Sequence, residues 1–439
     1  MKQHPILGVL ASGLALLAFV NAAQAQNSLP EDSPVSSEQS RAAIECFAQV
    51  KERVLAGNPQ LKSQTATLRS LRALTQQAAL LPNPVITFEA ENFGGNRSED
   101  DVEYTGGLSQ LIETGGKRYA RTSLATANAR AYELRRDITM AEILANARIA
   151  YAEVIAAESR LTLSEKEVAI RREAKRLISR KSSHGGALRL EVEKAEVSLQ
   201  TADVARDQRE QEVTVAKRAL ASLWGSDQTD LTFTTGELKL HEPETELLLM
   251  DAGDSPDVAI ATANRNAAEK SVDLQRAMAI PDVTVSAGYR RFDATDDHAF
   301  VAAVSIPLPL FDRNQFAADG AEERLKASQF DASHARVTVS VQLETLRDRL
   351  LLLLRERKLL EGSLLPQTEK VLESATDAYG LGRITYLDYL DAQTTYLERR
   401  ERLVTVTLAA IRKQVEIQRL SGTLLERITQ MDQGECHAQ

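Results

Sequence analysis

The sequence predicts an α+β protein made of two copies of one unit, in which long helices flank short β-hairpins. Three observations predict this fold class. Matching residues recur at a constant offset of 197 residues. Each half contains two short segments in which apolar and polar residues alternate, as in half-buried strands. The remaining long stretches are rich in Ala, Leu, Glu and Arg, which favour helices.

The constant offset indicates a tandem duplication, because chance matches would scatter. The matched pairs are Asn58-Pro59 with Ser255-Pro256, Pro84 with Pro281, Gly185 with Gly382, Ala195 with Ala392, and Gly225 with Gly422. We therefore expect a first repeat at residues 26–225, a connecting segment at 226–255, a second repeat at 256–422 and a C-terminal tail at 423–439.

The N-terminal residues 1–25 have the pattern of a signal peptide. Lys2 precedes an apolar run from Ile6 to Val20, and Ala23-Gln24-Ala25 is a small-residue cleavage site. The alternative is an N-terminal membrane anchor, although the run is shorter than the roughly 20 residues that a spanning helix needs.

Long helices are predicted on both sides of each alternating segment. Each repeat begins with a helix, at residues 38–81 and 257–279. Residues 117–181 contain neither Gly nor Pro, and at about 1.5 Å per residue they would span roughly 100 Å. Residues 188–224 form a return helix, and Pro366 is expected to kink the long helix of the second repeat.

The alternating segments predict one β-hairpin per repeat, at residues 84–112 and 281–307. The first strand has an apolar face of Ile86, Phe88 and Ala90 and a polar face of Thr87, Glu89 and Glu91. A charge that faces lipid is costly at the mid-depth of a membrane barrel. We therefore expect Glu89 and Glu91 to face a lumen.

Four strands per chain are too few to close a barrel, and an open sheet edge leaves backbone groups unsatisfied in lipid. Other copies of the chain must then complete the sheet. A periplasmic coiled-coil scaffold or adaptor is the alternative, since long helices of this composition are often structural. The two amphipathic hairpins at symmetric positions argue against it.

Several motifs occur in order along this duplicated frame. The chain reads Glu89-Ala-Glu-Asn-Phe-Gly-Gly95, then Leu108-Ser-Gln-Leu-Ile-Glu-Thr-Gly-Gly-Lys-Arg118, and later Tyr379-Gly-Leu-Gly-Arg-Ile-Thr-Tyr-Leu-Asp-Tyr-Leu-Asp-Ala-Gln393. Over essentially the whole mature chain it resembles the TolC family of outer-membrane factors, and the first hairpin region resembles the CzcC branch of that family.

The resemblance implies a fold, a function and partners. The fold is a homotrimer that shares one twelve-stranded outer-membrane β-barrel, continued by a long periplasmic α-helical barrel. The function is the exit duct of a tripartite resistance–nodulation–division efflux system that exports divalent heavy-metal cations. The partners are a periplasmic adaptor (membrane fusion) protein, the inner-membrane pump and the lipid of a Gram-negative outer membrane. A channel of the same fold for drugs, small molecules or secreted proteins is the alternative.

The resemblance also implies a periplasmic gate at the tip near residues 379–385. The family's pattern maps onto Tyr379, Gly382, Asp388 and Asp391. The two Asp residues are three apart and share a helix face, so three copies would form two acidic rings that attract cations. Alternatively, both carboxylates simply face solvent on a charged helix.

One departure from the pattern concerns the basic residue of the gate. The family often has a base two places after the Gly, where this chain has Ile384, and the base here is Arg383.

The first-repeat tip, near residues 181–188, has a different charge pattern. Glu191 and Lys194 match Asp388 and Asp391, so any ring there is mixed. Lys194 could pair with Asp391 of a neighbouring hairpin. His184, beside Gly185, could form a weak metal-binding ring, although a lone loop His is more often a polar turn residue.

The two cysteines, Cys46 and Cys436, lie near opposite ends of the mature chain. An even count in an exported chain is typical of a disulfide. Two independent thiols are the alternative.

The sequence contains no pattern that indicates an enzyme. Its six histidines stand apart, with no metal-ligand spacing, and there is no nucleophile elbow or phosphate loop. We expect no catalytic residue, resident metal or cofactor. The net charge of −9 gives no basic footprint for nucleic acid.

Overall fold

The computed structural model describes residues 44, 46–92, 102–184, 188–226, 238, 240 and 251–426. All of them belong to one unit, residues 43–439. The predicted signal peptide, residues 1–25, lies outside the described residues, as do most of the predicted connecting segment and of the C-terminal tail.

The first repeat begins with two helices, α1 (Phe47–Gly57) and α2 (Pro59–Ala78), where the sequence predicted one. Asn58 separates them, because its side-chain Oδ1 accepts a hydrogen bond from the Leu61 backbone N–H at 3.0 Å and so caps α2. Pro59 then occupies the first turn of α2, where its missing N–H costs nothing.

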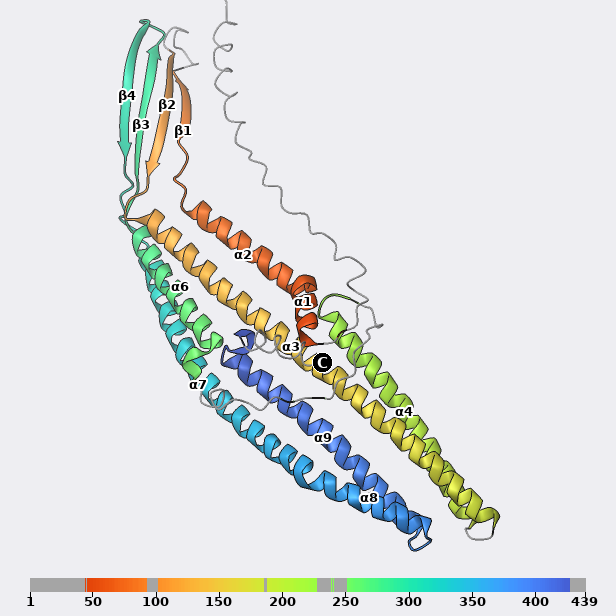
Figure 1. The fold of residues 1–439 in the computed structure, drawn as a ribbon. Coiled ribbons are helices and arrows are strands. Elements are labelled where there is room, and N and C mark those ends of the chain that lie inside the picture. Colours follow the sequence, from red (N-terminus) through yellow and green to blue (C-terminus); the bar gives the residue numbers. More distant parts are fainter. Residues whose placement is uncertain are drawn as a thin grey trace, which may run out of the picture. The chain divides into compact units, whose positions relative to one another are not determined.

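The remaining helices follow the predicted order (Figure 1). They are α3 (Lys117–Ser183), α4 (Arg189–Ser222), the short 3₁₀ helix η3 (Ala252–Asp254), α6 (Pro256–Met278), α7 (Gln315–Leu359), α8 (Leu365–Gly380) and α9 (Tyr386–Leu420). α3 has 67 residues and packs against α2, α4, α6 and α9. It is therefore the helix around which both repeats are arranged.

The long helix of the second repeat is interrupted next to Pro366. A π-helical segment η4 (Leu360–Leu364) separates α7 from α8, and Pro366 lies in the first turn of α8. Proline lacks the N–H that would bond to the carbonyl four residues earlier. The wider π turn accommodates that missing bond.

The four strands form one antiparallel sheet in the order β1-β2-β3-β4 (Figure 1). They are β1 (Val85–Glu91), β2 (Glu103–Ile112), β3 (Val283–Phe292) and β4 (Asp297–Ser305). β1–β2 and β3–β4 are consecutive pairs, whereas β2–β3 joins the two repeats. The α+β fold class is confirmed.

The two faces of the sheet differ in polarity. Ile86 pairs with Leu108, Leu108 with Ala287, and Ala287 with Ala302, so these side chains share one face. On the same face Ile86 is 83% exposed and Phe300 90% exposed. A single chain therefore leaves a broad apolar surface open to its surroundings.

A network of charged side chains joins the sheet to the helices. The Lys117 Nζ lies 2.7 Å from the Asp282 Oδ1, and the Thr114 backbone N–H donates to the same oxygen at 2.9 Å. Arg121 forms a bidentate ion pair with Glu113. Its Nε also donates a hydrogen bond to the Ala78 carbonyl at 2.9 Å. The start of α3 is thus fixed to the end of α2 and to the start of β3.

The main core lies where helices of both repeats meet. Its fully buried side chains include Phe47 of α1, Val154 of α3, Leu220 of α4, Leu350 of α7 and Ile417 of α9. Among the described residues, no helix is long and apolar enough to cross a membrane.

Candidate gate at the hairpin tips

The tip of the second repeat is a helical hairpin in which Gly382 lies just after the end of α8. Gly382 has φ +70°, a backbone conformation that costs glycine little. Its N–H donates to the Tyr379 carbonyl at 3.0 Å, and the Arg383 N–H donates to the Ala378 carbonyl at 2.8 Å. This bond pair is a Schellman cap. Gly382 and Arg383 therefore act here through the backbone, and the Arg383 residue is exposed.

Tyr379 is buried inside this tip, with 6% of its surface exposed. Its ring stacks on Tyr389 at a centroid distance of 5.0 Å and lies 6.1 Å from Tyr386. Lys181 of α3 places its Nζ 4.3 Å from the centre of the Tyr379 ring and donates to the Tyr379 carbonyl at 3.4 Å. One lysine of the first repeat is thus attached to Tyr379 of the second.

The tips of both repeats share a small apolar cluster. The tip cluster consists of Ala174 and Ile178 of α3, Ala195 of α4, Tyr379 of α8 and Tyr386 of α9. Burial raises the pKa of the Tyr379 phenol, and nearby Tyr386 and Glu191 raise it further. Tyr379 therefore stays neutral at physiological pH.

Asp388 and Asp391 lie exposed on the first turns of α9. They line an open groove of about 630 Å³ between α8 and α9, which Lys370 also lines. The Asp388 carboxylate accepts hydrogen bonds from the Thr385 hydroxyl at 2.6 Å and the Thr385 backbone N–H at 3.0 Å. These bonds lower the pKa of Asp388, so this carboxylate is ionised at neutral pH.

The structure therefore gives Asp388 a local role as well. With Thr385 it forms a capping box, since the Thr385 hydroxyl also accepts from the Asp388 N–H at 3.2 Å. Asp391 makes no such bond among the described residues and is the freer of the two carboxylates.

The first-repeat tip repeats half of this capping box, because Leu188 stands where the second repeat has Thr385. Glu191, which is 197 residues before Asp388, accepts a hydrogen bond from the Leu188 backbone N–H at 3.3 Å. Lys194 is exposed. The His184 Nδ1 lies 2.8 Å from the Arg180 carbonyl, so Nδ1 carries a proton and only Nε2 is left as a ligand. Gly185 lies outside the described residues.

No metal-binding centre appears in the part of the chain that the structure describes, since no three His, Cys, Asp or Glu residues gather there as ligands would. Cys46 is disulfide-bonded. Its predicted partner Cys436 lies outside the described residues, so the Cys46–Cys436 pairing stays a prediction.

Glu89 and Glu91 lie on the polar face of the sheet, as the alternation predicted. Sequence reasoning missed Arg290 of β3, whose Nη2 lies 3.1 Å from a Glu91 carboxylate oxygen and whose Nη1 lies 3.0 Å from Glu103. It also missed Thr385, although the Thr385-x-x-Asp388 spacing is a capping-box signature. No sequence signal marks Lys181, because its contact spans 198 residues.

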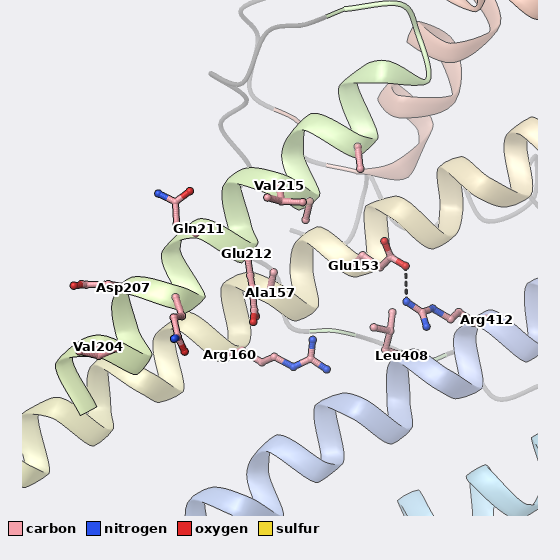
Figure 2. Close-up of a pocket in the computed structure, with 13 residues that line it drawn as sticks. Glu153, Ala157, Arg160, Val204, Asp207, Gln211, Glu212, Val215, Leu408 and Arg412 are labelled. Carbon is pink, nitrogen blue, oxygen red and sulfur yellow. Dashed lines mark hydrogen bonds and ion pairs between the residues drawn. The ribbon is translucent and has the colours of Figure 1, made fainter. Parts of the chain in front are cut away.

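A second groove, of about 760 Å³, lies between α3, α4 and α9. Figure 2 shows Arg412 of α9 pointing at Glu153 of α3. The Arg412 Nη2 lies 2.5 Å from the Glu153 Oε1. Val204 and Val215 of α4 line the other side of the groove. Both valines are more than half exposed. The groove is therefore partly apolar and open in the single chain.

The fold is that of solved outer-membrane channels. Residues 50–226 and 252–423 match the Outer membrane efflux protein family, so the chain belongs to that family. It is a protein of the outer membrane that extends into the periplasm. Outer-membrane channels of this family and fold are not enzymes.

Two relatives place the chain in the CzcC-like heavy-metal branch of the family. It is 26% identical over 367 residues to the cobalt-zinc-cadmium resistance protein CzcC of Cupriavidus metallidurans. The match covers 83% of this chain and 87% of CzcC. It is 29% identical over 301 residues to the nickel and cobalt resistance protein CnrC of the same organism, covering 67% and 71%.

The fold is similar to that of solved channels. The crystal structure of the outer membrane protein VceC of Vibrio cholerae matches with a TM-score of 0.71 at 21% identity, covering 86% of this chain and 96% of that one.

Proposed function

We propose that this chain forms, as a homotrimer, the outer-membrane exit duct of a tripartite resistance–nodulation–division efflux system that exports divalent heavy-metal cations. The observation that carries the proposal is the four-stranded sheet. It has an exposed apolar face, a charged opposite face, and two edge strands, β1 and β4, that pair with nothing further among the described residues.

A membrane can accept such a sheet only if its edges are paired. β4 of one copy can pair with β1 of the next, and three copies then close a barrel of twelve strands. The apolar face would meet lipid and the face with Glu89 and Glu91 would line the lumen, because charges facing lipid are costly.

Cation preference follows from the tip of the second repeat. Asp388 and Asp391 are exposed in the single chain, and the hydrogen bonds from Thr385 keep Asp388 ionised. Three copies would place these carboxylates in two rings, which attract cations and repel anions. Lys194 and Glu191 on the first tip add a charge pair beside them.

Heavy metals are supported as cargo by the two relatives, whose names record cobalt, zinc, cadmium and nickel resistance. The metal is substrate here, and the duct needs only to conduct it. We propose that the periplasmic adaptor protein and the inner-membrane pump supply metal selection and energy.

Metal resistance of a deletion strain tests the proposal. We expect loss of the gene to lower the growth-inhibiting concentration of at least one of cobalt, zinc, cadmium and nickel, and the intact gene to restore it. The Asp388→Asn/Asp391→Asn variant should assemble normally and restore less resistance. Unchanged metal resistance together with a raised sensitivity to drugs would contradict heavy-metal export and favour a drug channel.

A further inference from the structure

The polar face of the sheet has an uneven charge balance. By strand register, its described residues include four carboxylates and one cation, namely Glu89, Glu91, Glu103, Asp297 and Arg290. The net charge of this face is therefore −3 per chain. All five residues lie near the hairpin tips, at the end of the strands far from the helices.

Arg290 is bound to three polar groups on two other strands. Its Nε donates to the Thr105 Oγ1 at 2.9 Å, its Nη1 lies 3.0 Å from Glu103, and its Nη2 lies 3.1 Å from Glu91. The side chain is 27% exposed. One guanidinium thus neutralises part of the charge of two carboxylates and ties β1 to β3 across β2.

The other two carboxylates have no such partner. Glu89 and Asp297 are exposed, and no ion pair to either is found among the described residues. The same face therefore carries two free carboxylates and two that are held by Arg290.

We propose that Arg290 sets the charge selectivity of the extracellular end of the pore. This inference rests on the proposed function, since the polar face lines a pore only in the closed barrel. A departing divalent cation binds most tightly where several free carboxylates converge, and conduction requires that binding be weak enough to leave. Because Arg290 pairs with Glu91 and Glu103, the other two carboxylates, Glu89 and Asp297, are left to attract cations at the exit. The four carboxylates therefore do not act together as a cluster that would retain the cation.

The chain offers a matched control one residue away. Arg291 lies on the same strand but on the opposite, apolar face, in register with Tyr104 and His298. It pairs with Asp293 at 3.4 Å and Asp296 at 3.2 Å. Arg291→Gln therefore removes the same charge and also frees two carboxylates, but outside the pore.

The test is the reversal potential of the full-length channel in planar bilayers under a KCl gradient. The parent carries Asp388→Asn and Asp391→Asn, so that the tip rings do not dominate selectivity. We expect Arg290→Gln to raise the potassium-to-chloride permeability ratio at least about four-fold at low salt. Loss of one unit charge about 10 Å from the ion in water favours potassium about two-fold and disfavours chloride about two-fold, and the trimer loses three such charges. The rise should vanish near 1 M KCl, where the screening length is about 3 Å.

Three further variants are measured in the same way. Arg290→Lys and Arg291→Gln should keep the parent ratio, and Glu89→Gln, which breaks no ion pair, should lower it. Equal ratios for Arg290→Gln and Arg291→Gln would overturn the inference. If Arg290→Gln fails to assemble, an unchanged ratio in Glu89→Gln overturns it instead. A parent that forms no conducting pore at all would overturn the proposed channel itself.

Discussion

Single side chains at the tips show what the sequence could and could not reveal. Gly382, Asp388 and Asp391 could be found from spacing, because a cap and a helix face are local features. The capping role of Asp388 was visible in the four residues from Thr385 to Asp388, and it competes with the view that Asp388 serves only as a gate charge. The partner of Tyr379 could not be found, because Lys181 belongs to the other repeat.

Lys181 gives a prediction at this scale. Replacing Lys181 by Met removes its cation–π contact with Tyr379, a contact worth about 0.5–2 kcal/mol, so the two tips should separate roughly 2 to 30 times more readily. We expect larger or more frequent openings in single-channel recordings and greater entry of large antibiotics into cells.

Lys175 is the control for this change. It lies on the same helix and pairs with Glu196 of α4, within one hairpin, so Lys175→Met should leave the conductance unchanged. Equal effects of the two substitutions would mean that the Lys181 contact does not hold the tips together.

Helices and strands were predicted well where the sequence pattern lies in neighbouring residues, and strand pairing between distant segments was not predicted. The period-2 alternation placed Ile86 and Glu89 on opposite faces of the sheet, as the register has them. The break at Asn58 was missed, although a cap residue before a proline is a helix-start signal. The β2–β3 pairing had no sequence signal, because no turn joins strands that lie in different repeats.

The Lys117–Asp282 pair lies directly below this non-local pairing, and we expect it to stabilise the junction. Burial raises the pKa of Asp282, but the hydrogen bonds from Lys117 and Thr114 outweigh burial and leave the pKa below the usual 3.8. Asp282→Asn should cost about 1.5–3 kcal/mol, as expected for a hydrogen bond to a charged group. On unboiled gels the oligomer should dissociate at a lower sample temperature than the parent.

The pH dependence of this effect follows from the lowered pKa. The contribution of Asp282 is fully present above pH 3.8 and is lost as pH falls below that value, so the difference between parent and variant should disappear in strong acid. Lys270→Met removes a solvent-accessible surface pair with Asp273 and is the control, expected to have little effect. A deficit in Asp282→Asn that persists unchanged in strong acid would argue that the pair is not its cause.

At the scale of the whole molecule, the duplication and the strand count together lead to the assembly. Gly225 and Gly422, 197 residues apart, both have positive φ, and each lies against the proline that starts a helix, Pro59 or Pro256. Each repeat thus brings one hairpin to a shared sheet whose outer edges remain open. The sequence could predict that other copies must close this sheet, but the number three came from the family resemblance, because strand counting alone fixes no stoichiometry.

The most direct test of the shared barrel is a gel of purified outer membranes, run with unboiled and boiled samples. We predict a detergent-resistant species near three times the mass of the mature chain in the unboiled lane, which boiling converts to the single chain. A protein that is absent from the outer membrane and runs as one chain in both lanes would contradict the trimeric channel.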